Sequence, residues 1–358
     1  MSALLFIVFT LAVFTVPLIP AIHEFLTKTD VAPLPVPVGY DIDPRRFAYN
    51  FKAMVYDAAS AYLDDGQPIK AGNVERTFKI YDPDDAASQD VHARDILVSR
   101  SSVLIPRGTW IHSEIYSRGQ VRCRTASHVR AVFSERALVL GASVAVMRWA
   151  HGQVVHAQDR NELYGRITAE SMIHVRNRAV FERLYAPVIR FGDRHGPTRF
   201  GRHLPERVSL DASTCGRLLF NQPELRRTVL EGDVVIPANT LIDTNLVVRG
   251  NLRIGDNVRI VGSVKSRGNM FIGHDCEITG SAVAQHSLLV GRRSQVLGPA
   301  IGERRIVLGN DSMIGSAQSL VTVTSERIDI HSGVIVFGSI WAREFGRAVG
   351  RSSVRSRS

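Results

Sequence analysis

The residues best suited to chemistry in this sequence are a histidine and an aspartate that stand side by side. The segment Ile272-Gly-His-Asp-Cys276 contains His274 and Asp275, and His286 follows at the same position two six-residue units later. Near neutral pH a histidine can take a proton from a hydroxyl or an amine, with Asp275 or a neighbouring group orienting its ring. A lone histidine at a polar position is also a common surface residue. Whether His274 is a catalytic base or a surface side chain therefore depends on the structural element that carries it.

Other catalytic and metal-binding patterns do not occur in the sequence. It contains no GxSxG nucleophile segment, no phosphate loop of the Walker type and no HExxH metal motif. The cysteines Cys123, Cys215 and Cys276 lie far apart without a CxxC pair, so we expect reduced thiols rather than zinc ligands. The sequence therefore predicts no cofactor and no metal site.

His274 and Asp275 belong to eleven consecutive six-residue units that run without interruption from Val234 to Pro299. The first and third residues of nearly every unit are apolar or small, and a spacing of two places them on one face of a short strand. Glycine, asparagine or aspartate at the fifth and sixth positions suits a corner. Such a fixed short period predicts an all-β fold, a β-helix (β-solenoid) in which three units close one triangular coil. The inward residues expected to hold the coil include Leu252, Ile254, Val258, Ile260, Ile272 and Ile278.

An earlier stretch of the chain repeats this pattern less regularly. Val103-Leu-Ile-Pro-Arg-Gly-Thr109 aligns with Val234-Val-Ile-Pro-Ala-Asn-Thr240, and Gly119 then falls on Gly250 at the same offset. We infer an internal duplication that produces two solenoid lobes. The inward pairs expected in the first lobe are Val103 and Ile105, Thr109 and Ile111, Ile115 and Ser117, and Val121 and Cys123.

The repeat also predicts where the chain divides. Its phase shifts around Ala300 to Arg305, where we expect a loop or a distorted corner, and Gly192 to Glu231 interrupts the rhythm between the lobes. The expected organisation is an anchor at 1–23, a spacer with a short helix at 24–92, a first lobe at 93–191, a linker at 192–231, a second lobe at 232–341 and a basic tail at 342–358.

The N-terminal segment carries no charged side chain from Met1 to Ile22. At about 1.5 Å per residue, the apolar run Leu4 to Ala21 is long enough to cross the hydrocarbon layer, so we expect a transmembrane helix. A cleaved secretory signal is the alternative, although no Lys or Arg precedes the run and no small-x-small cleavage site follows it. The basic residues all come after the run, which favours a cytoplasmic body.

Two shorter segments flank the solenoid. Val31 to Val38 contains three prolines and predicts an extended spacer, and apolar residues at helical spacing between Pro44 and Leu63 predict a short amphipathic helix. In the tail, Arg343, Arg347, Arg351 and Arg355 recur every four residues. On a helix they would form a basic stripe for acidic lipid headgroups or an acidic partner, and the alternative is a disordered basic tail.

The net charge of +10 comes mainly from arginine. Arginine excess can favour phosphate binding, but aromatic residues are sparse and no recognition motif accompanies the charge. We therefore predict no nucleic-acid partner.

The six-residue units between about Leu230 and Asn310 resemble those of the bactofilins, bacterial polymer-forming cytoskeletal proteins built on a β-helix. The resemblance lies in repeated glycine units such as Gly250-Asn-Leu252, Gly262-Ser-Val264 and Gly268-Asn-Met270. It implies end-to-end assembly and the scaffolding of cell-envelope machinery, without an active site. The anchor, the second lobe and the basic tail depart from the family pattern and put free filament formation in doubt.

The units also resemble those of hexapeptide-repeat acyltransferases, because Ile254-Gly-Asp-Asn-Val258 fits that repeat. That resemblance implies a sugar or nucleotide-sugar substrate, an acyl-CoA donor and His274 as the base. Such enzymes commonly build their sites between subunits with an inserted loop, which the run from Val234 to Pro299 lacks. We therefore favour a scaffold without a small-molecule substrate. We expect it in the bacterial inner membrane, self-associating and recruiting an envelope partner for a process such as polysaccharide synthesis or secretion.

Overall fold

The structure is a computed structural model that describes residues 2–19, 23, 43–69, 77–81, 95–193, 206–207, 217–222 and 227–350. The chain forms two units, Met1–Asp43 and Pro44–Ser358. The first contains the helix α1 (Ser2–Thr15) and the short 3₁₀ helix η1 (Val16–Leu18). Among the residues described, no helix combines the length and the apolar character that crossing a membrane requires. The predicted proline spacer at 31–38 lies outside the described residues.

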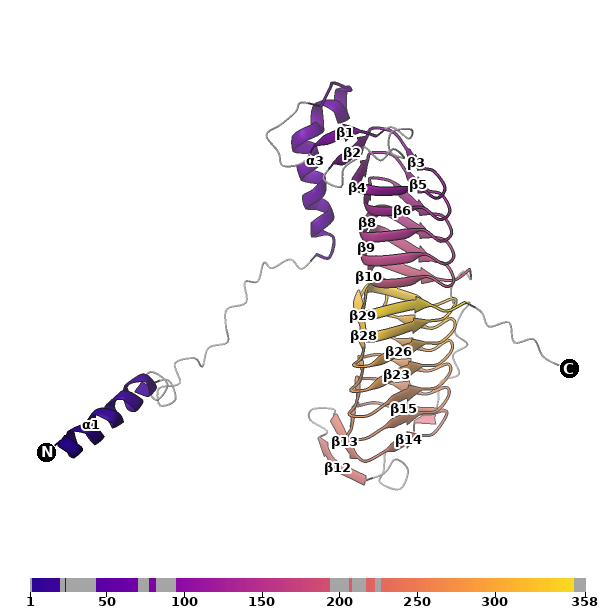
Figure 1. Ribbon diagram of the computed structural model, residues 1–358. Coiled ribbons are helices and arrows are strands. Elements are labelled where there is room, and N and C mark those ends of the chain that lie inside the picture. Colours follow the sequence, from indigo (N-terminus) through magenta and orange to yellow (C-terminus); the bar gives the residue numbers. More distant parts are fainter. Residues whose placement is uncertain are drawn as a thin grey trace. The chain divides into compact units, whose positions relative to one another are not determined.

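The second unit is built on a β-solenoid of about 12 coils, which confirms the predicted all-β fold (Figure 1). Each coil has three sides, and strands on the same side of successive coils pair in parallel. We call these three stacks columns. In the two lobes the first column begins with residues 96–99 and 227–231, the second with 103–105 and 234–236, and the third with 110–111 and 240–242. Paired residues mostly lie 17 or 18 positions apart in sequence, as Val103 pairs with Val121 and Val121 with Leu138.

Two lobes of coils make up the solenoid, and several long strands turn a corner and serve two or three columns. The first lobe contains β2 (Ile96–Ser99), β3 (Val103–Ile105), β4 (Trp110–Ser117), β5 (Val121–Cys123), β6 (His128–Ser134), β7 (Ala137–Leu140), β8 (Ala145–Ala157), β9 (Glu162–Val175) and β10 (Val180–Phe191). The second contains β13 (Arg227–Glu231), β14 (Val234–Ile236), β15 (Thr240–Ile242), β16 (Asn245–Val248), β17 (Leu252–Ile254), β18 (Arg259–Ile260), β19 (Val264–Ser266), β20 (Met270–Ile272), β21 (Glu277–Ile278), β22 (Ala282–Ala284), β23 (Ser287–Val290), β24 (Gln295–Val296), β25 (Ala300–Gly302), β26 (Arg305–Leu308), β27 (Met313–Ile314), β28 (Val321–Ile330) and β29 (Ile335–Ala348).

The inward positions of the six-residue units form the core, as the sequence predicted. Leu252, Ile254, Val258, Ile260, Ile272 and Ile278 are each between 0% and 2% exposed. In the first lobe the predicted inward residues are buried as well, except for Thr109 at the outermost coil, which is half-buried. The shared offset of Gly119 and Gly250 also has a steric reason. A Cβ at either position would collide with the backbone of the preceding coil.

The predicted phase shift around Ala300 to Arg305 is wrong. Ala300 pairs with Ala282 and Arg305 with Ser287, both at the regular step of 18 residues. The extra residues lie further on, because the next step joins Ala300 to Val323. Gly302 obscured the continuing pattern, since it occupies an inward position where an apolar side chain was expected.

The corner between the second and third columns has a left-handed backbone in every coil. In the second lobe these residues are Asn239, Asn257, Asp275, Arg293 and Asp311, with φ between 54° and 61°, and Gly333, with φ 84°. Asparagine and aspartate tolerate this conformation better than other side chains, so their recurrence at the corner positions has a backbone cause.

The two lobes meet through their C-terminal strands. β10 pairs antiparallel with β29, so that Leu184 lies opposite Ile340 and Arg183 opposite Trp341. Figure 1 shows the consequence: β10 and β29 are adjacent in the middle of the solenoid, whereas β3 and β14 lie toward its opposite ends. The first columns of the two lobes thereby join into one continuous side.

Strands occur in three segments for which the sequence predicted none. β29 continues to Ala348, past the expected end of the lobe at Trp341, because Arg347 pairs with Asp329 and Ala348 is buried. The expected linker includes β13 and two further strands, β11 (Glu206–Arg207) and β12 (Arg217–Gln222). The expected spacer includes β1 (Phe78–Ile80), which pairs with β2.

A helix, α3 (Arg46–Asp65), packs on the outer side of the first column in the first lobe, where the sequence predicted a short amphipathic helix. Gly66 ends it with φ 75°, a left-handed conformation that favours glycine. Its buried residues Ala48, Phe51, Val55, Ala59 and Leu63 pack against Ile96, Val98, Tyr116, Ala131, Phe133 and Trp149. This side of the lobe is therefore apolar on both faces of the strands.

We expect Ile260→Asp to destabilise the second lobe by about 3–5 kcal/mol, because it places an unpaired charge among fully buried side chains. Lys265→Asp is the matched control, since Lys265 points outward from β19 and is exposed. Urea denaturation of the two variants measures the difference. Equal midpoints for Ile260→Asp and the wild type would show that the inward register is wrong.

Candidate functional site: corners, coil ends and the helix-covered side

His274 stands at an exposed corner immediately after β20. Its Nδ1 atom accepts a hydrogen bond from the Arg292 backbone N–H at 2.9 Å. The backbone N–H of His274 donates to Asp256 Oδ1 at 2.7 Å. A neutral imidazole has one donor and one acceptor nitrogen, so the bond to Nδ1 leaves the ring proton on Nε2. To act as a general base through Nδ1, His274 would have to lose its hydrogen bond from the Arg292 amide of the next coil.

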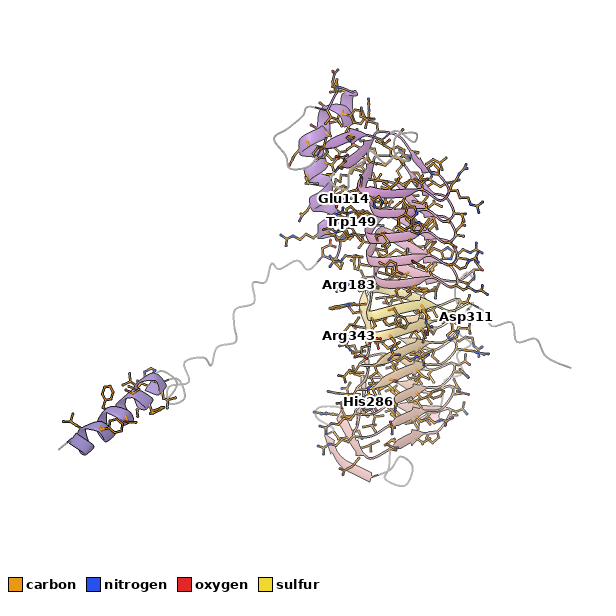
Figure 2. The ribbon with its side chains drawn as sticks, viewed as in Figure 1. Glu114, Trp149, Arg183, His286, Asp311 and Arg343 are labelled. Carbon is orange, nitrogen blue, oxygen red and sulfur yellow. The ribbon has the colours of Figure 1, made fainter. Side chains whose placement is uncertain are left out.

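Asp275 does not orient the His274 ring. Its carboxylate pairs with the guanidinium of Arg293, one coil further on, through contacts of 2.6 and 2.7 Å. The group that orients the ring is the Arg292 amide. His286 follows β22 at a different corner, so the solenoid does not bring the two histidines together. Figure 2 marks His286 on the second lobe.

Both cysteines among the described residues are free and buried inside the coils. Burial raises the pKa of the Cys123 thiol to about 12 and that of Cys276 to about 11. Thiols with such pKa values stay protonated at neutral pH and are poor nucleophiles. Cys123 and Cys276 therefore act as small apolar residues of the core. Cys215 lies outside the described residues.

Arg343 and Arg347, the two tail arginines that the structure describes, lie neither on a helix nor in a disordered tail. Both belong to β29, Arg343 at the irregularity that follows Ala342 and Arg347 opposite Asp329. Arg343 donates to the carbonyl of Glu303 at 2.7 Å and pairs with Glu326, and Arg347 pairs with Asp329 at 3.1 Å. Arg351 and Arg355 lie outside the described residues.

The described residues cover only part of the outer ends of the solenoid. In the first lobe β1 covers β2, and in the second lobe β11 covers β15 while β12 covers β13. Over the described ranges, the other outermost segments pair on one side only: β3 with β5, Trp110 and Ile111 of β4 with β6, and β14 with β17. β3 and β14 belong to the second column, and they are the two segments that align in the sequence.

At β14 the open edge has a defined hydrogen-bonding direction. The Val234 N–H donates to Asn251, and the Ile236 carbonyl accepts from Gly255, so these two residues bond to the next coil. In a parallel pair the residue between them directs its N–H and C=O to the opposite side. Val235 therefore presents both groups at the open edge, and its side chain is 59% exposed.

The equivalent edge at β3 is partly occupied. The Leu104 carbonyl accepts a hydrogen bond from the Tyr81 hydroxyl at 2.9 Å. Tyr81 follows β1, so the segment that covers β2 also reaches the end of the second column. Of the two edges, β14 is the one better suited to pair with another strand.

The helix-covered side contains a polar network that the sequence did not reveal. Glu135 receives hydrogen bonds from the hydroxyls of Tyr116 and Tyr56 and pairs with Lys52 at 2.8 Å. Burial by itself would raise the pKa of Glu135, but the bonds from Lys52 and Tyr116 lower it below its usual range. Burial and the bond to Glu135 raise the pKa of Tyr116. The network ties α3 to the first column through a charged group that stays ionised.

A weak signal for this side was present in the sequence. Tyr116, Phe133 and His151 recur at steps of 17 and 18 residues, and their rings stack on successive coils. Arg166 and Arg183 recur at the same step on β9 and β10. Because these residues alternate with the inward ones, the inward repeat alone does not point to them.

No family model, no curated protein and no solved structure matches this chain. The resemblance of its six-residue units to bactofilins thus stays a prediction from the sequence.

We expect His274→Ala to lower the free energy of unfolding by about 1 kcal/mol, because it removes an acceptor from the Arg292 N–H. His274→Asn restores a side-chain acceptor of the kind that Asn251 provides at another corner, where its Oδ1 receives the Asn269 N–H at 2.9 Å. Urea denaturation of the two variants measures the difference. If the His274 side chain does not stabilise the corner, both variants will be as stable as the wild type.

Proposed function

We propose that this chain is a membrane-anchored β-solenoid scaffold that self-associates through its coil ends and organises a bacterial envelope process such as polysaccharide synthesis or secretion. The observation that supports it most is the open edge of β14, because an unpaired strand edge is a template for pairing with another chain. The lobes join through their C-terminal strands, which leaves the N-terminal coils available for such contacts.

The arrangement of the ends favours short assemblies over long filaments. β1, β11 and β12 cover part of the two ends, and the Tyr81 hydroxyl bonds to the edge of β3. A second subunit would therefore pair mainly with the second column of the second lobe. Contact between two β14 edges is isologous and closes as a dimer.

The envelope assignment depends on the N-terminal segment and on the bactofilin resemblance. Every residue of α1 is uncharged, and the apolar run in the sequence extends beyond it to Ala21. A single pass through the inner membrane with a cytoplasmic body agrees with the basic residues that follow the run. A C-terminal reporter that is active only in the periplasm would contradict this orientation.

The hexapeptide-repeat acyltransferase stays the alternative function. Its base would be His274, whose Nδ1 is already engaged by the Arg292 amide. A discrete trimer in solution would favour that alternative, and a CoA-binding assay on the wild type and His274→Ala would then test it.

Val235→Pro is expected to weaken self-association of the full chain in detergent. The substitution removes the N–H that faces the open edge and leaves the bonds to β17, and proline is tolerated at such edges. Because the contact is isologous, each dimer loses an N–H donor from both subunits, which should raise the concentration for half-assembly about tenfold or more, equivalent to about 1.4 kcal/mol or more. Light scattering and electron microscopy measure the assemblies.

Val235→Thr is the control, because it keeps the N–H and a β-branched side chain. Assemblies that are unchanged in Val235→Pro would exclude β14 as the contact. A wild-type chain that stays monomeric at high concentration would contradict self-association itself.

The double substitution Leu5→Arg and Phe9→Arg is expected to reduce membrane association. A charged residue in the middle of a membrane-spanning helix costs about 2.5–3.5 kcal/mol on insertion scales. Flotation of cell membranes measures the fraction of protein that rises with them, and Phe9→Leu is the apolar control. Unchanged flotation of the double variant would show that the N-terminal segment is not the anchor.

A further inference from the structure

A groove runs between α3 and the outer side of the first lobe. Its volume is about 680 Å³, within the usual range of about 300–1,000 Å³ for small-molecule sites. One wall is formed by Phe47, Phe51 and Met54 of α3, and Trp149 of β8 lies on the opposite side. Figure 2 shows Glu114, Trp149 and Arg183 following one another on the side of the lobe where α3 lies.

Two arginines stand next to each other in this groove. Arg166 of β9 and Arg183 of β10 are direct partners in neighbouring parallel strands, whose backbones are about 4.8 Å apart. The Arg166 guanidinium lies over the ring of Phe47 at 5.1 Å, and that of Arg183 lies over Trp341 at 4.6 Å. The aromatic rings hold the two guanidinium groups in place without neutralising them.

The acidic groups nearby are engaged elsewhere. Glu114 pairs with Arg148 at 3.1 Å, and Glu182 accepts the Gly165 N–H at 3.0 Å. Within the described part of the chain, no ion pair joins a carboxylate to Arg166 or Arg183. Burial and the charge of Arg183 lower the pKa of Arg166, which reflects two like charges without an anion between them.

We propose that this groove binds a small phosphorylated molecule with an apolar or aromatic body. The phosphate lies between the guanidinium groups of Arg166 and Arg183, and the body lies against Phe47 and Met54. A phosphate monoester carries a charge of about −1.5 to −2 at pH 7 and so balances the two arginines. Arginine presents a planar fork of donors that matches phosphate oxygens.

The groove also limits what else it can take. The carboxylates of Glu114 and Glu182 line it, so a polyanion would meet repulsion at its walls. Inorganic phosphate would satisfy the arginines but leave the apolar wall exposed to water. The site therefore suits a single phosphate on an apolar body, and the inference does not depend on the scaffold function.

The test uses the full chain in detergent with phenyl phosphate as the probe. We expect calorimetric binding and a rise in the thermal transition, with inorganic phosphate bound more weakly. Arg166→Gln and Arg183→Gln should each weaken binding of phenyl phosphate about tenfold or more, because each removes a charged fork. Arg253→Gln is the matched control, since Arg253 is exposed and lies over the ring of Phe271 on the other lobe.

Arg166→Lys and Arg183→Lys keep the charge but lose the fork, and are expected to bind with intermediate affinity, which separates a lost contact from a misfolded lobe. A soluble short-chain phosphatidic acid, which also carries a phosphate monoester, is titrated in parallel to distinguish a lipid phosphate from that of a soluble ester. Binding of either probe that fails in the glutamine variants and persists in Arg253→Gln supports the site and identifies the source. Binding of neither probe, or equal binding by the glutamine variants and the wild type, overturns it.

Discussion

Parallel pairing between successive coils is the interaction on which the rest of this structure depends. Residues 17 or 18 positions apart are hydrogen-bonded neighbours, as Leu252 is to Met270. That one step stacks inward side chains into a continuous core, and it places corner residues with left-handed backbone above one another. Polar side chains at the corners can then bond to the backbone of the next coil, as His274 does to Arg292. A residue that looks catalytic in the sequence thereby acquires a structural role.

Such stacking leaves a strand edge to be paired at both ends of each lobe, and the chain pairs these edges in two ways. The C-terminal coils join through the antiparallel pairing of β10 with β29. Short strands cover part of the N-terminal coils, and β14 stays open among the described residues. The edge that the described residues leave open is therefore small, and the proposed self-association would be confined to it.

The join between the lobes also builds surface features that neither lobe has alone. Arg183 belongs to the first lobe and Trp341 to the second, and their side chains meet only because β10 and β29 are neighbours. On the other flank, α3 places Phe47 over Arg166. The groove is lined by α3 and the first lobe, and Trp341 of the second lobe supports Arg183 beside it; among the described residues no carboxylate pairs with Arg166 or Arg183.

The sequence by itself determined the β-solenoid and its inward residues, because a short period repeats the same side-chain environment in every coil. It also indicated α3 through the helical spacing of residues such as Phe51 and Val55. The sequence was misleading at Gly302, where the absence of an inward side chain suggested a phase shift. It was also misleading at Arg343 and Arg347, whose spacing suits a helix although both residues lie in a strand. Only the tertiary structure decided that the lobes meet through their C-terminal strands and that Arg166, Arg183 and Trp341 lie together. These contacts join residues far apart in the chain, and no local periodicity encodes such pairings.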